Sequence, residues 1–87
     1  MYKYEDLKPQ VFTEKAQKDF LKVRDNAKKL LSTSGSFNML SALKGVYGDS
    51  WLQLAFVDRL VELGEIREIT PSGTAGQDRV FVSGRSE

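Results

Sequence analysis

The fold is decided by residues 50–70, which read SWLQLAFVDRLVELGEIREIT. Apolar side chains recur at helical spacing up to Gly64, and the opening Ser-Trp-Leu-Gln is a capping-box pattern typical of a helix start. Glycine commonly ends a helix in the left-handed conformation. After Gly64 the apolar period shortens to that of a β-strand. The stretch therefore predicts a helix over 50–63 that leads directly into a strand over 65–70.

A second strand is predicted over 79–83, where the sequence reads RVFVS. The intervening residues 71–78, PSGTAGQD, have turn chemistry throughout and predict a hairpin with a long, mobile loop. We expect the hairpin to cover a small helical core with apolar residues drawn from Ile66, Ile69, Val80 and Val82. A helical wheel divides the 50–63 helix into two sets of side chains. The inward set is Leu52, Phe56, Val57, Leu60, Val61 and Leu63, and the outward set is Trp51, Ala55, Asp58, Arg59 and Glu62.

A long helix is predicted over 13–32, with Thr13 as its N-cap. Its inward stripe comprises Ala16, Phe20, Val23, Ala27, Leu30 and Leu31. On the opposite side of the wheel lie Lys15, Lys18, Lys22 and Lys29. Because Glu14–Lys18 and Asp25–Lys29 stand four residues apart and can pair, we interpret this basic side first as a solvated helix surface.

A short helix is predicted over 37–44, with Ser36 or Asn38 as its cap. In this helix Leu40 and Leu43 are expected to face the core. The glycines that follow favour a break in the chain before the next helix begins.

The first twelve residues are interpreted as a flanking arm, residues 13–83 as the domain, and residues 84–87 as a frayed tail. Pro9 is expected to discourage a helix through Lys8. The arm is nevertheless too apolar for a free tail, so we expect it to dock on the domain. A contact in a homodimer is the alternative.

Composition excludes several classes of function. The 87 residues contain no Cys and no His, so disulfides, thiolate chemistry and the usual ligands of zinc, copper and haem are missing. Without a recognisable catalytic motif we expect no enzymatic activity, no cofactor and no small-molecule substrate. The net charge is +1, and no apolar run approaches the roughly 18 residues of a membrane span. A cytoplasmic protein without membrane contact is the resulting expectation.

The element order, three helices followed by a two-stranded hairpin, resembles the winged helix-turn-helix superfamily. The resemblance rests on residues 37–43, the glycine turn, 50–63 and the passage through Gly64 and Ile66 into the strands. It implies an α+β fold, mainly helical, with a three-helix helix-turn-helix core and a two-stranded β-hairpin wing. An unrelated α+β miniature domain with the same element order is the structural alternative.

The resemblance implies a nucleic-acid-binding module of transcription-regulator type, with duplex DNA as the partner. In such proteins the third helix usually enters the major groove and the wing touches the backbone or minor groove. The candidate contacts are Lys44, Ser50, Gln53, Arg59, Arg67, Thr74, Gln77 and Arg79. Acidic residues on the third helix oppose phosphate binding, so few contacts and modest affinity are expected. Arg59 has an intrahelical alternative with Glu62, and Arg67 and Arg79 can instead pair across the hairpin with Glu65, Glu68 or Asp78.

A protein-interaction adaptor is the second hypothesis. Its candidate contacts are Trp51, Leu54, Asp58 and Glu62. Trp51 is interpreted first as a partly buried anchor beside Tyr47, and an exposed Trp would suit a protein hot spot better than DNA.

Overall fold

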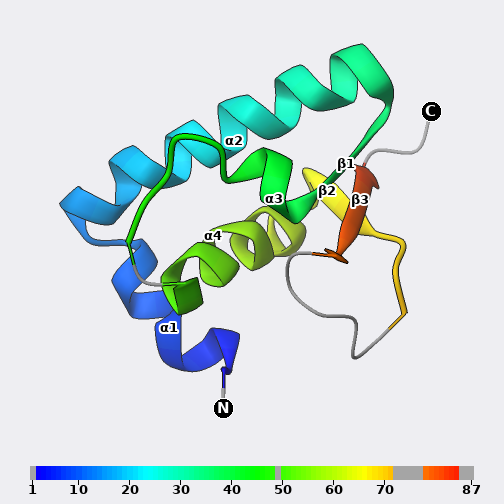
Figure 1. Ribbon diagram of the computed structural model, residues 1–87. Helices are drawn as coiled ribbons and strands as arrows, with labels where there is room; N and C mark the ends of the chain where they lie inside the picture. The colour runs from blue at the N-terminus through cyan, green and yellow to red at the C-terminus, as the bar shows by residue number, and fades with distance from the viewer. Residues whose placement is uncertain (1, 49, 72–77, 85–87) are drawn as a thin grey trace.

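The computed structural model describes residues 2–48, 50–71 and 78–84 of the chain. In these residues four helices and three short strands follow one another in the order α1-α2-β1-α3-α4-β2-β3 (Figure 1). The helices are α1 (Tyr4–Val11), α2 (Glu14–Ser34), α3 (Met39–Ala42) and α4 (Ser50–Glu62). The strands are β1 (Ser36–Asn38), β2 (Ile66–Glu68) and β3 (Val80–Ser83). The mainly helical α+β class expected from the sequence is confirmed, with one helix and one strand more than predicted.

The first helix, α1, corrects the prediction for the arm, because it runs through both Lys8 and Pro9. Proline inside a helix removes one backbone hydrogen bond and usually costs about 3 kcal/mol. Tertiary packing opposes this cost, since Leu7 and Val11 are buried and α1 packs against α4 and α2. The arm therefore docks on the rest of the chain and contributes to its core.

Helix α2 confirms the prediction for 13–32 and continues two residues further. Thr13 caps it, and its side-chain hydroxyl accepts a hydrogen bond from the amide of Ala16 at 3.3 Å. Gly35 ends it with a positive φ of 77°, the left-handed conformation that glycine adopts without strain. The buried side chains Ala16, Phe20, Val23 and Ala27 belong to the predicted stripe.

The predicted helix over 37–44 is wrong in its first part. Residues 36–38 form β1, and the helix begins only after Asn38, whose side chain accepts a hydrogen bond from the amide of Ser41. The reason lies across the sheet, where Phe37 is buried and stacks on Phe81 with 5.5 Å between the ring centroids. In this short helix Met39 and Ala42 are buried, whereas Leu40, which was expected to face the core, is exposed.

Helix α4 begins and ends as predicted, but its inward side is rotated. Ala55 is buried instead of facing outward, and Val61 and Leu63 are exposed instead of facing the core. The rotation follows from α1, which packs along α4 and covers a side that the helical wheel assigned to solvent. Leu60 is fully buried, as expected.

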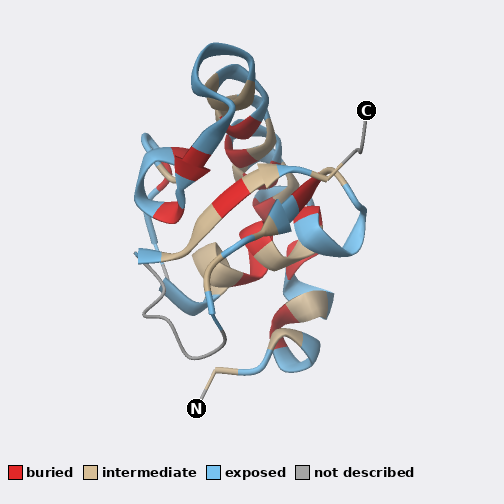
Figure 2. Ribbon diagram, turned by 90° about the vertical axis from the view of Figure 1, so that its right-hand side faces the viewer, coloured by how far each residue is buried: buried red, intermediate tan, exposed pale blue. Residues whose placement is uncertain are grey.

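Strands β2 and β3 lie within the two predicted strands and pair antiparallel, with Ile66 opposite Ser83. Strand β1 pairs with the other edge of β3, so the sheet order is β1-β3-β2. Buried residues gather where the sheet meets the helices (Figure 2). Phe81 and Ile66 fill this layer, whereas Ile69, expected in the core, is exposed, and the valines of β3 are only half-buried. The alternation of side chains along β3 explains the burial of its residues, because Phe81 points inward and the valines on either side of it point outward.

Residue 84, assigned to the frayed tail, donates its backbone amide to the carbonyl of Glu65 at 3.1 Å. The predicted loop tip at 72–77 and the tail from residue 85 lie outside the described residues.

Candidate nucleic-acid interface

A cluster of partly buried polar side chains around Asp58 joins the segment before α1 to α4 and the sheet. The hydroxyl of Tyr2 donates to Asp58 at 2.5 Å, and Nη2 of Arg79 lies 2.8 Å from the other carboxylate oxygen. Arg79 also donates through Nε and Nη2 to both oxygens of Glu68, at 3.1 and 2.9 Å. These bonds from Arg79, aided by one from Thr70, hold the pKa of Glu68 below its usual range despite the opposing effect of burial. Burial, followed by the hydrogen bond to Asp58, raises the pKa of Tyr2.

A second cluster surrounds Glu62, one helical turn further along α4. Its carboxylate accepts hydrogen bonds from the Lys8 ammonium at 2.8 Å, from the Tyr4 hydroxyl at 3.0 Å and from Arg59. The bonds from Lys8 and Arg59 lower the pKa of Glu62 to about 2. Burial and the bond to Glu62 raise the pKa of Tyr4 to about 12. The Arg59 guanidinium also lies 4.9 Å from the centre of the Phe12 ring.

These two clusters contain four of the candidate residues predicted from the sequence. The predicted alternatives for Arg59, pairing with Glu62, and for Arg79, pairing with Glu68 across the strands, are confirmed. Only 15% of the Arg79 side chain is exposed, and its guanidinium links α4 to β2 through Asp58 and Glu68. Of the adaptor candidates, Glu62 is bound by Tyr4 and Lys8 of α1. Asp58 is bound by Tyr2, which precedes α1, and by Arg79. The outer side of α4 is therefore occupied by α1, and no spacing rule in the sequence indicates partners more than fifty residues away.

The remaining basic and polar candidates are spread over the molecule. Lys44 is exposed in the turn between α3 and α4, and Ser50 is exposed at the first residue of α4. The side-chain amide of Gln53 donates to the carbonyl of Val46 at 3.0 Å and so fixes this turn on α4. Arg67 is exposed on β2 and makes no ion pair with another described residue.

Two candidates, Thr74 and Gln77, lie outside the described residues. Trp51 is 44% exposed and meets the ring of Tyr2 edge to face at 6.4 Å, so it is a partly covered residue of the α1–α4 contact. Leu54 is half-buried against the core. Tyr47, expected beside Trp51, is 85% exposed.

The exposed cations gather instead on α2. We call the side of this helix formed by Lys15, Lys18, Lys22 and Lys29 the lysine face. All four side chains are exposed, and none makes an ion pair within the described part of the chain. The expected pairs Glu14–Lys18 and Asp25–Lys29 are thus not formed. Among the described residues, the four lysines of this face therefore carry no ion pair, although the i,i+4 spacing predicted two.

The turn between α3 and α4 is fastened along one edge of the lysine face. The side-chain amide of Asn26 on α2 donates to the carbonyls of Ala42 and Lys44, at 3.0 and 2.9 Å. From there the turn runs along α2 toward the junction of α1 and α2 before α4 begins (Figure 1). Within this turn, the carbonyl of Lys44 is bound by Asn26, and Tyr47 lines a hollow together with Lys15 of the lysine face.

A hollow of about 360 Å³ lies between this turn and the start of α2, and we call it the turn pocket. It is lined by Gln10, Thr13, Lys15, Ala16, Asp19, Tyr47, Gly48 and Leu52. The lining combines an aromatic ring, aliphatic side chains, polar groups and one lysine of the lysine face. Sequence reasoning did not single out this site, because its residues come from three separate segments.

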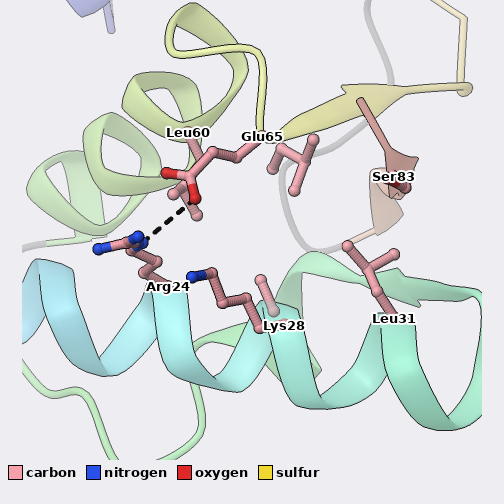
Figure 3. A pocket seen from close by; sticks show the side chains of 8 residues that line it. Arg24, Lys28, Leu31, Leu60, Glu65 and Ser83 are labelled. Carbon is pink, nitrogen blue, oxygen red and sulfur yellow. Dashed lines mark hydrogen bonds and ion pairs between the residues drawn. The ribbon is translucent and has the colours of Figure 1, made fainter. Parts of the chain in front are cut away.

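A smaller hollow of about 240 Å³ lies between α2, the end of α4 and the sheet (Figure 3). Arg24 of α2 crosses its rim to Glu65, with 3.2 Å between Nε and Oε1. Lys28 lies beside this pair, and Leu31 and Leu60 form part of the apolar wall. Because the guanidinium already has a carboxylate partner, this hollow offers less free positive charge than the lysine face.

No protein-family model matches the chain, and neither the curated proteins nor the solved structures contain a match to it. Among the described residues, no helix has the length and apolar character needed to cross a membrane. The described part of the chain also holds no group of three acidic side chains placed to bind a metal ion.

Proposed function

We propose that this chain is a nucleic-acid-binding module whose phosphate contacts lie on the lysine face and the adjoining α3–α4 turn. The observation that carries the proposal is the distribution of unpaired charge. The lysine face and Lys44 are exposed without a partner among the described residues, whereas Arg59 and Arg79 are bound to carboxylates. Free cations are what phosphates attract, so this side of the molecule is the one suited to a polyanion.

The spacing of the lysines supports an extended ligand. Positions 15, 18, 22 and 29 follow one side of a continuous helix, and at 1.5 Å per residue they span about 21 Å. A nucleic-acid strand offers a phosphate every few ångströms over such a length, so several contacts form at once. Asp25 lies on the same side of the helix and lowers the net charge, which favours modest affinity.

We further interpret α2, α3, α4, β2 and β3 as a winged-helix arrangement. In support, α3 and α4 are joined by a turn with two glycines in positive φ, and α4 leads through Gly64 into the paired strands. The packing of α1 on α4 departs from the usual use of that fold, in which the third helix enters the major groove. The departure supports a contact through α2 rather than through α4.

The proposal is tested by fluorescence anisotropy with labelled duplex and single-stranded DNA at several salt concentrations. If five lysines reach phosphates, the logarithm of the affinity for a single strand should fall with a slope of about −3.5 against the logarithm of salt concentration. Lys22→Glu should weaken binding and flatten this slope by about 0.7 or more.

Matched controls carry the same charge change elsewhere. Lys3→Glu alters an exposed residue at the start of α1, and Arg67→Glu alters the predicted wing. Both should bind within about twofold of the natural chain. A loss at Arg67→Glu equal to that at Lys22→Glu would shift the contact to the strands. If neither DNA form nor single-stranded RNA binds at low salt, the proposal fails and the adaptor hypothesis, with Trp51 and Leu54 as its contacts, takes its place.

A further inference from the structure

We propose that the turn pocket holds an unpaired base, so that the module's ligand is a single-stranded nucleic acid. The base would stack on Tyr47 while the sugar-phosphate backbone follows the lysine face. This inference rests on the proposed function and specifies the ligand class of the same surface.

The position of Tyr47 is the first observation behind this inference. Its side chain is 85% exposed, although it belongs to the lining of the turn pocket. The neighbouring glycines at 45 and 48 have φ values of 82° and 123°, which only glycine adopts readily, and so they determine the path of the turn. The hydrogen bond between Asn26 and Lys44 fastens this turn to α2. The ring is therefore presented at the rim of a hollow by a turn whose residues before Tyr47 are fastened to α2 and α4.

The chemistry of the lining is the second observation. Ala16 and Leu52 provide an apolar wall, as an aromatic base requires. The side chains of Gln10 and Asp19 have no hydrogen-bond partner among the described residues, so they are available to the edge of a base. Lys15 belongs both to this lining and to the lysine face, and it links the pocket to the phosphate contacts. The hollow of about 360 Å³ is within the size range of small-ligand sites.

The combination favours single strands over duplexes. Bases in a duplex are stacked on one another and paired at their edges, so they cannot enter a side pocket without being flipped out. Aromatic rings beside a basic groove are the usual means of binding single strands. The carboxylate of Asp19 accepts hydrogen bonds only, which favours a base with amino and ring N–H donors, guanine above thymine.

The test compares labelled 12-nucleotide probes: alternating thymine and guanine, thymine alone, the corresponding RNA, and a 12-base-pair duplex. We expect the single strands to bind more tightly than the duplex, and the guanine-containing strand to bind most tightly. Tyr47→Ala should weaken single-strand binding about 5- to 150-fold, the value of one stacked base, while Tyr47→Phe stays within about twofold. Asp19→Asn should reduce the preference for guanine. The DNA and RNA probes identify which sugar the site accepts.

The outcomes separate this inference from the proposed function. If Lys22→Glu weakens binding but Tyr47→Ala does not, the base pocket is refuted and the phosphate surface stands. Equal binding of duplex and single strand would likewise overturn the single-strand assignment alone. If no probe binds the natural chain, both proposals fail. Circular dichroism of each variant establishes that the fold is intact, which an exposed turn residue should not affect.

Discussion

Replacing Arg79 by methionine should destabilise the fold more than any other change of a charged side chain in its described part. Arg79 joins three elements, because it lies on the approach to β3 and binds Asp58 of α4 and Glu68 of β2. Its guanidinium also lies 5.1 Å from the centre of the Phe81 ring. Methionine keeps the length and much of the packing of the side chain while it removes the charge.

The magnitude follows from burial. Removing one partner of a fully buried ion pair costs about 3–5 kcal/mol, because the remaining charge is left without compensation. Here the side chains of Arg79, Asp58 and Glu68 are 15%, 19% and 26% exposed, so water can partly hydrate the two carboxylates that remain. We therefore expect a loss of about 2 kcal/mol in the free energy of unfolding. Arg79→Lys should lose about half as much, since it keeps the charge but not the forked geometry.

The assay is urea unfolding followed by far-ultraviolet circular dichroism. With an m-value of about 1 kcal/mol/M, typical of a small domain, the unfolding midpoint should fall by about 2 M urea at pH 7. Arg67→Met is the control, because Arg67 is exposed and should cost less than about 0.5 kcal/mol.

Acid should reduce the difference in the free energy of unfolding between the natural chain and Arg79→Met. The pKa of Glu68 is lowered in the folded protein, chiefly by Arg79. The stability that ionised Glu68 contributes is therefore present above its unfolded pKa of about 4.3 and is lost as the pH falls through its folded pKa. The gap in the free energy of unfolding should therefore narrow steadily as the pH falls below about 4.3. A loss at pH 7 no larger than that of the Arg67 control, or a gap that grows in acid, would refute the assignment of Arg79 as a structural link.

Three further predictions concern the core, the backbone and alkaline pH. Leu60→Ala should cost about 2–5 kcal/mol in urea unfolding, whereas Leu63→Ala should cost below about 1, and equal losses would contradict the observed rotation of α4. Gly84→Ala should lower the thermal midpoint by several degrees, because the added methyl group overlaps a backbone carbonyl of the α4–β2 turn, and an unchanged midpoint would show that this contact relaxes freely. The pKa values of Tyr2 and Tyr4 are raised in the folded state, so the stability they confer is present below about pH 10 and is lost as pH rises through the folded values. A variant with phenylalanine at both positions should lose less stability between pH 8 and 11 than the natural chain, and parallel loss would exclude this cause.

The elements with strong local signals could be predicted from the sequence. Helices α2 and α4 have long apolar periods, a capping threonine at 13 and ending glycines at 35 and 64, all of which act within a few residues. Strand β1 has no such signal, because a three-residue strand depends on Phe37 meeting Phe81 far along the chain. Helix α1 was not predicted because Pro9 disfavours a helix locally, and packing against α4 outweighs this preference.

The candidate site likewise has features that the sequence predicts and features that depend on tertiary contacts. The charge of the lysine face is visible on a helical wheel, but its lack of partners appears only when the whole surface is known. Conversely, the sequence presents Arg79 as a wing cation, whereas in the fold its partly buried guanidinium pairs with Asp58 and Glu68. The position of Tyr47 depends on the hydrogen bonds of Asn26, which no spacing rule predicts.

The strand order β1-β3-β2 also has a consequence for the chain during its synthesis. The central strand is made last of the three, so neither β1 nor β2 has a backbone partner until residue 83 has left the ribosome. Until then Phe37 and Ile66 lack the aromatic ring of Phe81, although the four helices of the described residues have already been synthesised. A nascent chain that stops before β3 therefore exposes apolar surface and two unpaired strand edges, the features that chaperones and proteases recognise.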